Sequence, residues 1–182
     1  SVEVDGVIIT VSADEGVFPE GATVSARKVT ASEENEVAEA IEEVREDSRN
    51  VAVSYTYDIT IHDVDGNEIE PDTDKGSVKV TFKMAEIANE NLETDIYHVE
   101  ETVSGLDATE LMVEEIIGDD AVVVETDGFS YYVVEFTYNE LRYVLNGDSS
   151  IKLSEILKAL AIEGTVSEAE VSNKDLFTVE KD

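Results

Sequence analysis

Hard oxygen ligands stand at alternating positions after a β-rich segment. Asp63, Asp65 and Asn67 are two residues apart, and Glu68 follows them. Carboxylate and amide oxygens are the ligands that Ca²⁺ prefers in proteins. Asp63, Asp65 and Asn67 therefore predict a calcium site, and Ca²⁺ is the one cofactor that the sequence suggests. The EF-hand order of acids is missing, so the alternative is a solvated hairpin turn, which Asp-Gly-Asn also favours.

Aromatic side chains offer a second kind of chemistry. A tyrosine ring presents flat apolar area with a polar tip and can line a carbohydrate or protein site. Because successive residues of a strand face opposite ways, one ring of the Tyr131-Tyr132 pair must point outward. The alternative is that these rings form sandwich core and cross-strand pairs. The candidates are Tyr55, Tyr57, Tyr131, Tyr132, Tyr138 and Tyr143.

The composition excludes several function classes. The chain has no cysteine, so thiol catalysis, Cys-based zinc sites and disulfides are ruled out, and its two histidines, His62 and His98, cannot form a His-rich metal site. Its 44 acidic and 12 basic residues give a net charge of -32, which repels phosphate backbones and anionic lipid headgroups. We therefore expect no nucleic-acid partner and no membrane insertion. Paired-acid glycosidase chemistry has no support, because among so many acids any chosen pair is arbitrary and no tryptophan offers a sugar platform.

The elements that must position these residues are mostly strands. One helix is predicted from Glu33 to Glu46, with Ser32 as its N-cap, because Val37, Ile41 and Val44 form an apolar stripe. Residues rich in Val, Ile, Tyr and Thr predict the strands. These cover Val2–Val11, Ala22–Val29, Val51–Ile61, Val78–Met84, Asp95–Glu100, Leu111–Ile117, Ala121–Glu125 and Phe129–Tyr138, with a short helical turn at Ala85–Asn91.

Many short strands with one inserted helix predict a β-sandwich over residues 1–136. Residues 137–182 differ in character and predict a small α+β module with a βαββ order, docked on the sandwich or truncated. Its expected elements are a strand at Leu141–Leu145, a helix starting near Ser154 with Leu160 on its buried side, and strands at Thr165–Val171 and Leu176–Glu180. The predicted fold class is thus mainly β, or α+β when the appendage is included.

Four segments resemble repeat modules of Firmicutes cell-surface proteins, which are themselves similar to the ZU5 β-sandwich domain of ankyrins and netrin receptors. These segments are Asp5–Val11, Gly16–Val24, Asp65–Pro71 and Asp127–Val134. The stretch Leu153–Gly164 resembles the small module that often follows in such proteins. The resemblance implies a modular Gram-positive surface protein, secreted or attached to the cell wall, and implies no established activity.

Some self-cleaving relatives of ZU5 domains cut a Phe-Ser bond in a His-Phe-Ser sequence, and Phe129-Ser130 stands at the equivalent place. In such a reaction Ser130 would attack the preceding carbonyl while a neighbouring histidine helps to deprotonate it. Here Gly128 replaces that histidine, with Asp127 before it, and His62 or His98 could approach only through the fold. An ordinary core strand is the favoured interpretation.

Intramolecular isopeptide bonds stabilise many surface modules of this kind. They require a buried lysine beside an asparagine, and Lys28, Lys79 and Lys83 lie on predicted strands. Because side chains alternate along a strand, Lys79 and Lys83 are expected to face solvent. The apolar side chains between and before them, Val78, Val80 and Phe82, would face the core.

The sequence favours a non-catalytic structural or adhesive module, a stalk or spacer, of an extracellular bacterial protein. Its expected partners are neighbouring modules of the same polypeptide. One alternative is an adhesin-like binding module for a host glycoprotein, an immunoglobulin or a glycan. The other is a self-cleaving ZU5-type domain that cuts at Phe129-Ser130.

Overall fold

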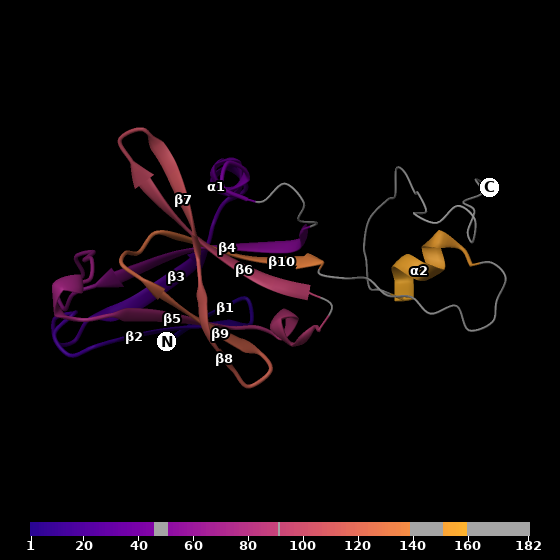
Figure 1. Cartoon of the computed structure of the whole chain (residues 1–182). Helices are drawn as coiled ribbons and strands as arrows, with labels where there is room; N and C mark the ends of the chain where they lie inside the picture. Colours follow the sequence, from indigo (N-terminus) through magenta and orange to yellow (C-terminus); the bar gives the residue numbers. More distant parts are fainter. Residues whose placement is uncertain (46–50, 91, 139–150, 160–182) are drawn as a thin grey trace. The chain divides into compact units, whose positions relative to one another are not determined.

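The computed structural model describes residues 1–45, 51–90, 92–138 and 151–159, and the chain divides into two units, Ser1–Glu140 and Leu141–Asp182 (Figure 1). The predicted sandwich boundary fell at residue 136, whereas the last strand of the first unit continues to Tyr138.

Strands dominate the first unit and form two five-stranded antiparallel sheets, which confirms the predicted mainly β sandwich. We name them the β5 sheet and the β10 sheet after their central strands. The β5 sheet has the order β1 (Val2–Val4), β2 (Val7–Ala13), β5 (Val78–Lys83), β9 (Ala121–Thr126), β8 (Val113–Ile117). The β10 sheet has the order β3 (Thr23–Lys28), β4 (Val51–His62), β10 (Tyr131–Tyr138), β6 (Leu92–Thr102), β7 (Gly105–Leu111).

The core lies between the two sheets and follows the alternation of each strand. In β5, Val78, Val80 and Phe82 are fully buried while Lys79 is half-buried and Lys83 exposed, as predicted. In β10, Tyr132 and Phe136 point into the same core. The Phe82 and Tyr132 ring centroids lie 5.9 Å apart, so aromatic contacts join the sheets.

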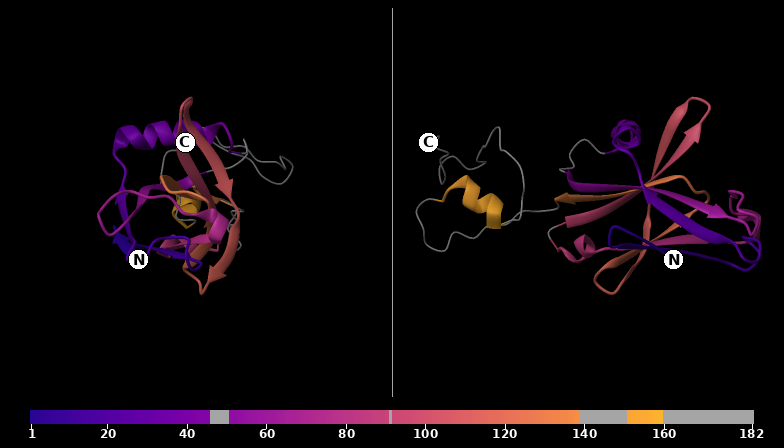
Figure 2. Two further views of the ribbon diagram at one scale, coloured as in Figure 1. Left: turned by 90° about the vertical axis from the view of Figure 1, so that its left-hand side faces the viewer. Right: turned by 180° about the vertical axis from the view of Figure 1, so that it is seen from behind.

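Helix α1 (Ala31–Glu42) connects β3 to β4 and covers the outer face of the β10 sheet (Figures 1 and 2). Its Val37 and Ile41 pack on Tyr97, Val99 and other residues of that face in a second apolar cluster. The central strands β6 and β10 of this sheet are therefore buried on both faces where α1 covers them.

The predicted bounds of this helix were wrong at both ends. Thr30, and not Ser32, is the N-cap, because its hydroxyl accepts from the Glu33 amide while the Glu33 carboxylate accepts from the Thr30 amide. The helix ends at Glu42, so Val44 lies beyond it and is 43% exposed.

Arg45, which follows α1, forms an ion pair with Glu135 of β10 at 2.5 Å. Glu135 occupies the outer face of the sheet and is 1% exposed. A buried carboxylate without a counter-charge would cost several kcal/mol, so the pair ties the end of the helix to the central strand.

Two of the predicted strands have a different form in the structure. The N-terminal run is a β1–β2 hairpin, whose two turn residues Asp5 and Gly6 both have positive φ, 50° and 85°. The predicted strand Leu111–Ile117 is divided between β7 and β8, which belong to different sheets. The described residues of this unit also contain two 3₁₀ turns, Thr73–Lys75 and, as predicted in type, Ala85–Ala88.

In the second unit the structure describes the helix α2 (Leu153–Ala159), which agrees with the predicted helix. Leu160 and the predicted strands Leu141–Leu145, Thr165–Val171 and Leu176–Glu180 lie outside the described residues. No helix in the described parts of either unit is both long and apolar enough to cross a membrane.

The cap of α1 should make the stability of this helix depend on pH. Hydrogen bonds from Arg27 and Thr30 lower the pKa of Glu33 from 4.5 to about 2. Because the folded-state pKa is depressed, the cap stabilises α1 above pH 4.5 and loses this contribution as the pH falls toward 2. In an NMR titration Glu33 should titrate at about pH 2, and in Arg27→Gln its midpoint should move toward 4.5. A Glu33 midpoint near 4.5 in the unmodified chain would contradict the observed cap.

Candidate functional site

The link between β9 and β10 carries the chain from one sheet to the other and forms the floor of a pocket of about 540 Å³. The pocket exists because β10 starts at Tyr131, which pairs with Asp58 of β4 and Val99 of β6. Both flanking strands continue past these positions, β4 to His62 and β6 to Thr102. A gap therefore opens between β4 and β6 where β10 has no residues to fill it.

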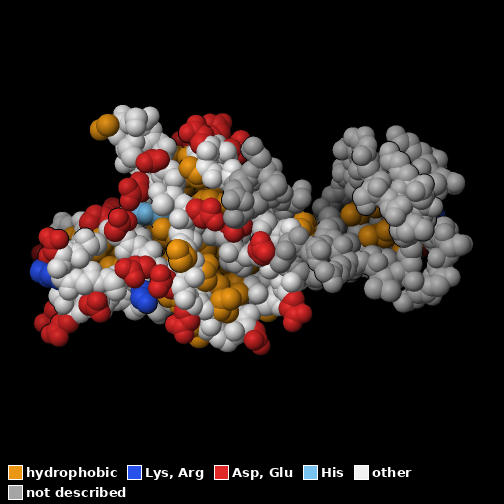
Figure 3. Space-filling view, in the orientation of Figure 1, with side chains coloured by type: hydrophobic (Ala, Val, Ile, Leu, Met, Phe, Trp, Pro, Cys, Tyr) orange, Lys and Arg blue, Asp and Glu red, His pale blue; other side chains and the backbone are white. Residues whose placement is uncertain are grey.

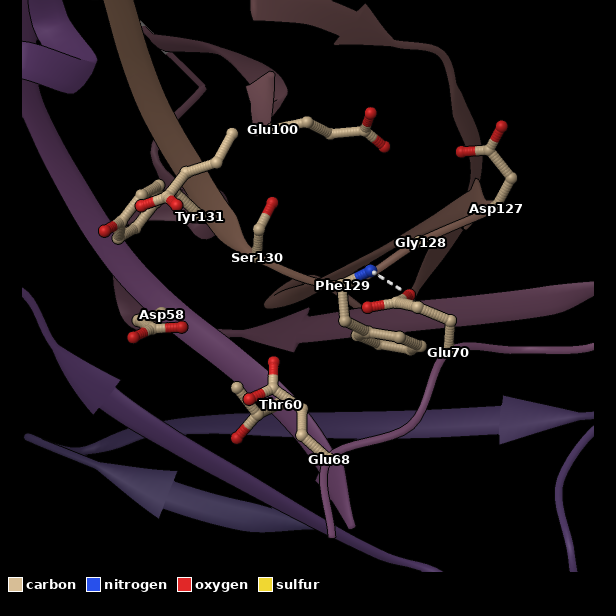
Figure 4. Close-up of a pocket in the computed structure, with 11 residues that line it drawn as sticks. Asp58, Thr60, Glu68, Glu70, Glu100, Asp127, Gly128, Phe129, Ser130 and Tyr131 are labelled. Atoms are coloured by element: carbon tan, nitrogen blue, oxygen red, sulfur yellow. Dashed lines mark hydrogen bonds between the residues drawn. The ribbon is translucent and has the colours of Figure 1, made fainter. Parts of the chain in front are cut away.

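Internal hydrogen bonds fix the backbone of this link. The Tyr132 hydroxyl donates to the Gly128 carbonyl at 2.6 Å and lies 2.6 Å from the hydroxyl of Thr126. The Phe129 amide donates to a Glu70 carboxylate oxygen at 3.1 Å (Figure 4). Gly128 and Phe129 are buried, so these bonds satisfy polar backbone groups that water does not reach.

His98 lies on the inner face of β6 beside this link and is 3% exposed. Its ring stacks on Tyr132 with a centroid distance of 4.7 Å. Nε2 lies 3.1 Å from Ser130 Oγ, and Nδ1 lies 3.5 Å from a Glu100 carboxylate oxygen. Burial lowers the pKa of His98, although the charges of Glu100 and Asp127 act in the opposite direction.

Carboxylates dominate the pocket wall, and none of the lining residues is Lys or Arg. Acidic side chains are also spread over the face of the sandwich shown in Figure 3. Burial and the charges of Glu68, Glu100 and Asp127 raise the pKa of Glu70. One lining carboxylate, that of Asp58, forms an ion pair at 2.7 Å with Arg27, which is not itself a lining residue. The acidic lining residues are Asp58, Glu68, Glu70, Glu100, Glu101 and Asp127.

The direction of one hydrogen bond restricts what Ser130 can do. Its hydroxyl donates to the Val99 carbonyl at 2.7 Å, because a carbonyl can only accept. The contact between Ser130 and His98 is then a bond from Nε2–H to the serine oxygen. In this arrangement His98 cannot accept the Ser130 proton, which a nucleophilic serine requires. Cleavage would first need the hydroxyl to leave Val99.

The structure brings together part of the predicted Phe129-Ser130 site. Of the two histidines considered, His98 contacts Ser130, whereas His62 lies at the end of β4 opposite Thr23 of β3. Glu100 and Asp127 complete the surroundings of His98. Glu100 was not among the predicted site residues, because the only sequence signal for it is its position two residues after His98 on the same strand.

The predicted calcium ligands are used within their own turn. Asp63 Oδ1 accepts from the backbone amides of Asp65 and Asn67, both at 2.9 Å, and Oδ2 accepts from Asn67 Nδ2 at 3.0 Å. These bonds lower the pKa of Asp63. They describe the solvated turn that was the alternative, and calcium binding at Asp63, Asp65 and Asn67 stays a prediction.

The predicted lysines and tyrosines differ in how deeply they are buried. Lys28 and Lys83 are exposed, and Lys83 pairs with Asp120 at 3.3 Å, so neither is in the buried setting of an isopeptide bond.

Tyr131 is half-buried and lines the pocket, whereas Tyr132 is in the core. Tyr57 also belongs to the core, Tyr55 and Tyr138 are half-buried, and Tyr143 lies outside the described residues.

Comparisons of the chain with protein families, with curated proteins and with solved structures found no match. The resemblance to ZU5-like surface modules therefore stays a prediction.

The hydrogen bond from Tyr132 to the link should contribute to the stability of the first unit. Tyr132→Phe removes one of the two hydroxyls that donate to the buried Gly128 carbonyl, the other being that of Thr126 at 3.1 Å, and this loss should destabilise the first unit by about 1 kcal/mol. Tyr131→Phe is the matched control, because it changes the adjacent, half-buried tyrosine. Urea unfolding followed by circular dichroism measures both. Equal effects of the two substitutions would show that the Gly128 bond contributes nothing specific.

Proposed function

We propose that the chain is a non-catalytic structural module, a spacer or stalk element, of a secreted or wall-attached bacterial surface protein. The observation that carries the proposal is the place of β10. This strand ends the first unit at its C-terminal side, and it lies between β4 and β6 with pairing on both sides along its length. A load that reaches Tyr138 must slide β10 past two neighbours, which breaks many hydrogen bonds together.

Packing supports the same proposal. The inner side chains of β10 are Tyr132, Val134 and Phe136, each 0% exposed. On the outer face Glu135 is held by Arg45. Strand β10 is thus held by both of its neighbours and on both of its faces. The acidic composition suits a module that is exposed to water and does not associate with nucleic acid or anionic lipid.

Single-molecule pulling tests this proposal. When the chain is pulled by its two ends, β1 should detach first, and the rest of the first unit should then unfold in one step of roughly 400 Å. In the comparison the load is applied between the C-terminal end and Glu90→Cys, a unique thiol in a chain without cysteine. Glu90 precedes Leu92, which pairs with Tyr138, so this load opens the pairing of β6 with β10 one residue pair at a time from one end, and the unfolding force should be clearly lower. Equal unfolding forces in the two geometries would contradict the proposal that β10 resists the load.

Self-cleavage at Phe129-Ser130 is the second candidate, because His98 Nε2 lies 3.1 Å from Ser130 Oγ. The hydrogen bond from Ser130 to Val99 opposes it. The structural proposal therefore predicts a single species at the sequence mass by intact-mass spectrometry and on a denaturing gel. Two fragments that meet at Phe129-Ser130, absent in Ser130→Ala, would replace the structural proposal with the self-cleaving one. A single species lighter by one ammonia would instead indicate an internal isopeptide bond.

A further inference from the structure

Three potential metal ligands meet at the rim of the pocket. One ring nitrogen of His98 and one carboxylate oxygen each of Glu100 and Asp127 lie within 4.8 Å of one another. Glu100 follows His98 by two residues on β6, so both side chains belong to the same face. Asp127 comes from the β9–β10 link. In Figure 4 the carboxylates of Glu100 and Asp127 extend toward each other across Gly128.

The hydrogen bonds of His98 leave one nitrogen facing these carboxylates. Because Ser130 donates its only hydroxyl proton to Val99, Nε2 of His98 must be the protonated nitrogen that donates to Ser130. In the neutral ring Nδ1 then carries a lone pair. This lone pair lies 3.5 Å from a Glu100 oxygen, so two acceptors face each other. The contact becomes favourable only when a cation or a proton lies between them.

Gly128 keeps the space between these groups open. A Cβ at this position would lie 3.2 Å from Glu100 Oε1 and 3.4 Å from His98 Cε1. It would also lie 3.6 Å from Glu70 Oε2, so a third carboxylate borders the same space. Any side chain at residue 128 would therefore crowd the position where the ligands converge.

From this arrangement we infer that His98 Nδ1, Glu100 and Asp127 form a site for a divalent transition metal ion, with Zn²⁺ as its representative. Ligands about 2.1 Å from a tetrahedral metal are about 3.4 Å apart, close to the 3.5 Å between Nδ1 and Glu100. Glu100 and Asp127 are exposed and can rotate inward to shorten the longer separations. Water from the pocket completes the coordination.

The surroundings of His98 match those of a metal-binding histidine. Such a histidine donates its second ring N–H to a fixed acceptor, which sets the tautomer and the ring orientation. Here Ser130 is that acceptor, and stacking on Tyr132 holds the plane of the ring. An imidazole ligand favours zinc and similar ions over Ca²⁺, which takes hard oxygen ligands. This site is thus distinct in residues and in chemistry from the Asp63 turn.

Zinc binding to the full chain tests the inference. Isothermal titration with Zn²⁺ should reveal one site per chain above the weak binding that a net charge of -32 produces. Glu100→Gln and Asp127→Asn each remove one ligand without a change of shape and should weaken binding at this site at least tenfold. Asp119→Asn removes an equal charge in the turn between β8 and β9 and should change the affinity less than twofold. Equal affinity in all four proteins would overturn the site.

NMR of the histidine side chains tests independently which ring nitrogen of His98 binds zinc. With ¹⁵N-labelled histidine, Zn²⁺ should shift Nδ1 of His98 while Nε2 keeps its proton, and His62 should stay unchanged. Ser130→Ala should keep the fold and weaken zinc binding about tenfold, because Nε2 loses its acceptor. A zinc-induced shift of Nε2, or no shift of either nitrogen, would contradict the inference. So would a resonance showing that a proton occupies Nδ1 in the presence of zinc.

Discussion

The hydrogen bond from the Tyr132 hydroxyl to the Gly128 carbonyl fixes the chain where it passes between the sheets. A buried carbonyl needs a partner, and at this position the sandwich supplies two, a core tyrosine of the following strand and the Thr126 hydroxyl. The same tyrosine stacks on His98 and contacts Phe82 of the opposite sheet. Together with the bond from the Phe129 amide to Glu70, this contact holds the link, of which Asp127 and Ser130 are the first and last residues, in place beside the pocket.

Much of the fold could be predicted because its core strands alternate clearly. Strand β5 is an example, with Val78, Val80 and Phe82 on one face and lysines on the other. Strand β7 (Gly105–Leu111) was missed, since it starts with a glycine, Ala108 is its one buried residue, and Asp107, Thr109 and Glu110 give it no apolar alternation. A short edge strand depends on its neighbour for its conformation, and no local pattern reveals that neighbour.

The candidate site was harder to predict than the fold. Ser130 attracted attention through a family resemblance, and His98 through the scarcity of histidine. Nothing local joins the two, because the pairing of β6 with β10 brings them together across 31 intervening residues. Among 44 acidic residues, nothing in the sequence marked Glu100 and Asp127 as neighbours of His98. Their proximity follows from how the strands pair in the folded sandwich. The composition limits which chemistry the chain can perform, whereas the pairing of the strands determines which side chains come together at the site.

The position of β10 also has a consequence for the order of folding. It is the last strand of the sandwich to be synthesised, yet it is the central strand of its sheet. Until residues 131–138 are available, β4 and β6 lack their common neighbour and Phe82 lacks Tyr132. Closing such distant pairings is slow compared with local folding. The β10 sheet therefore cannot be completed until this strand emerges, and a polypeptide without that sheet can still be threaded through a narrow pore that the finished sandwich could not enter.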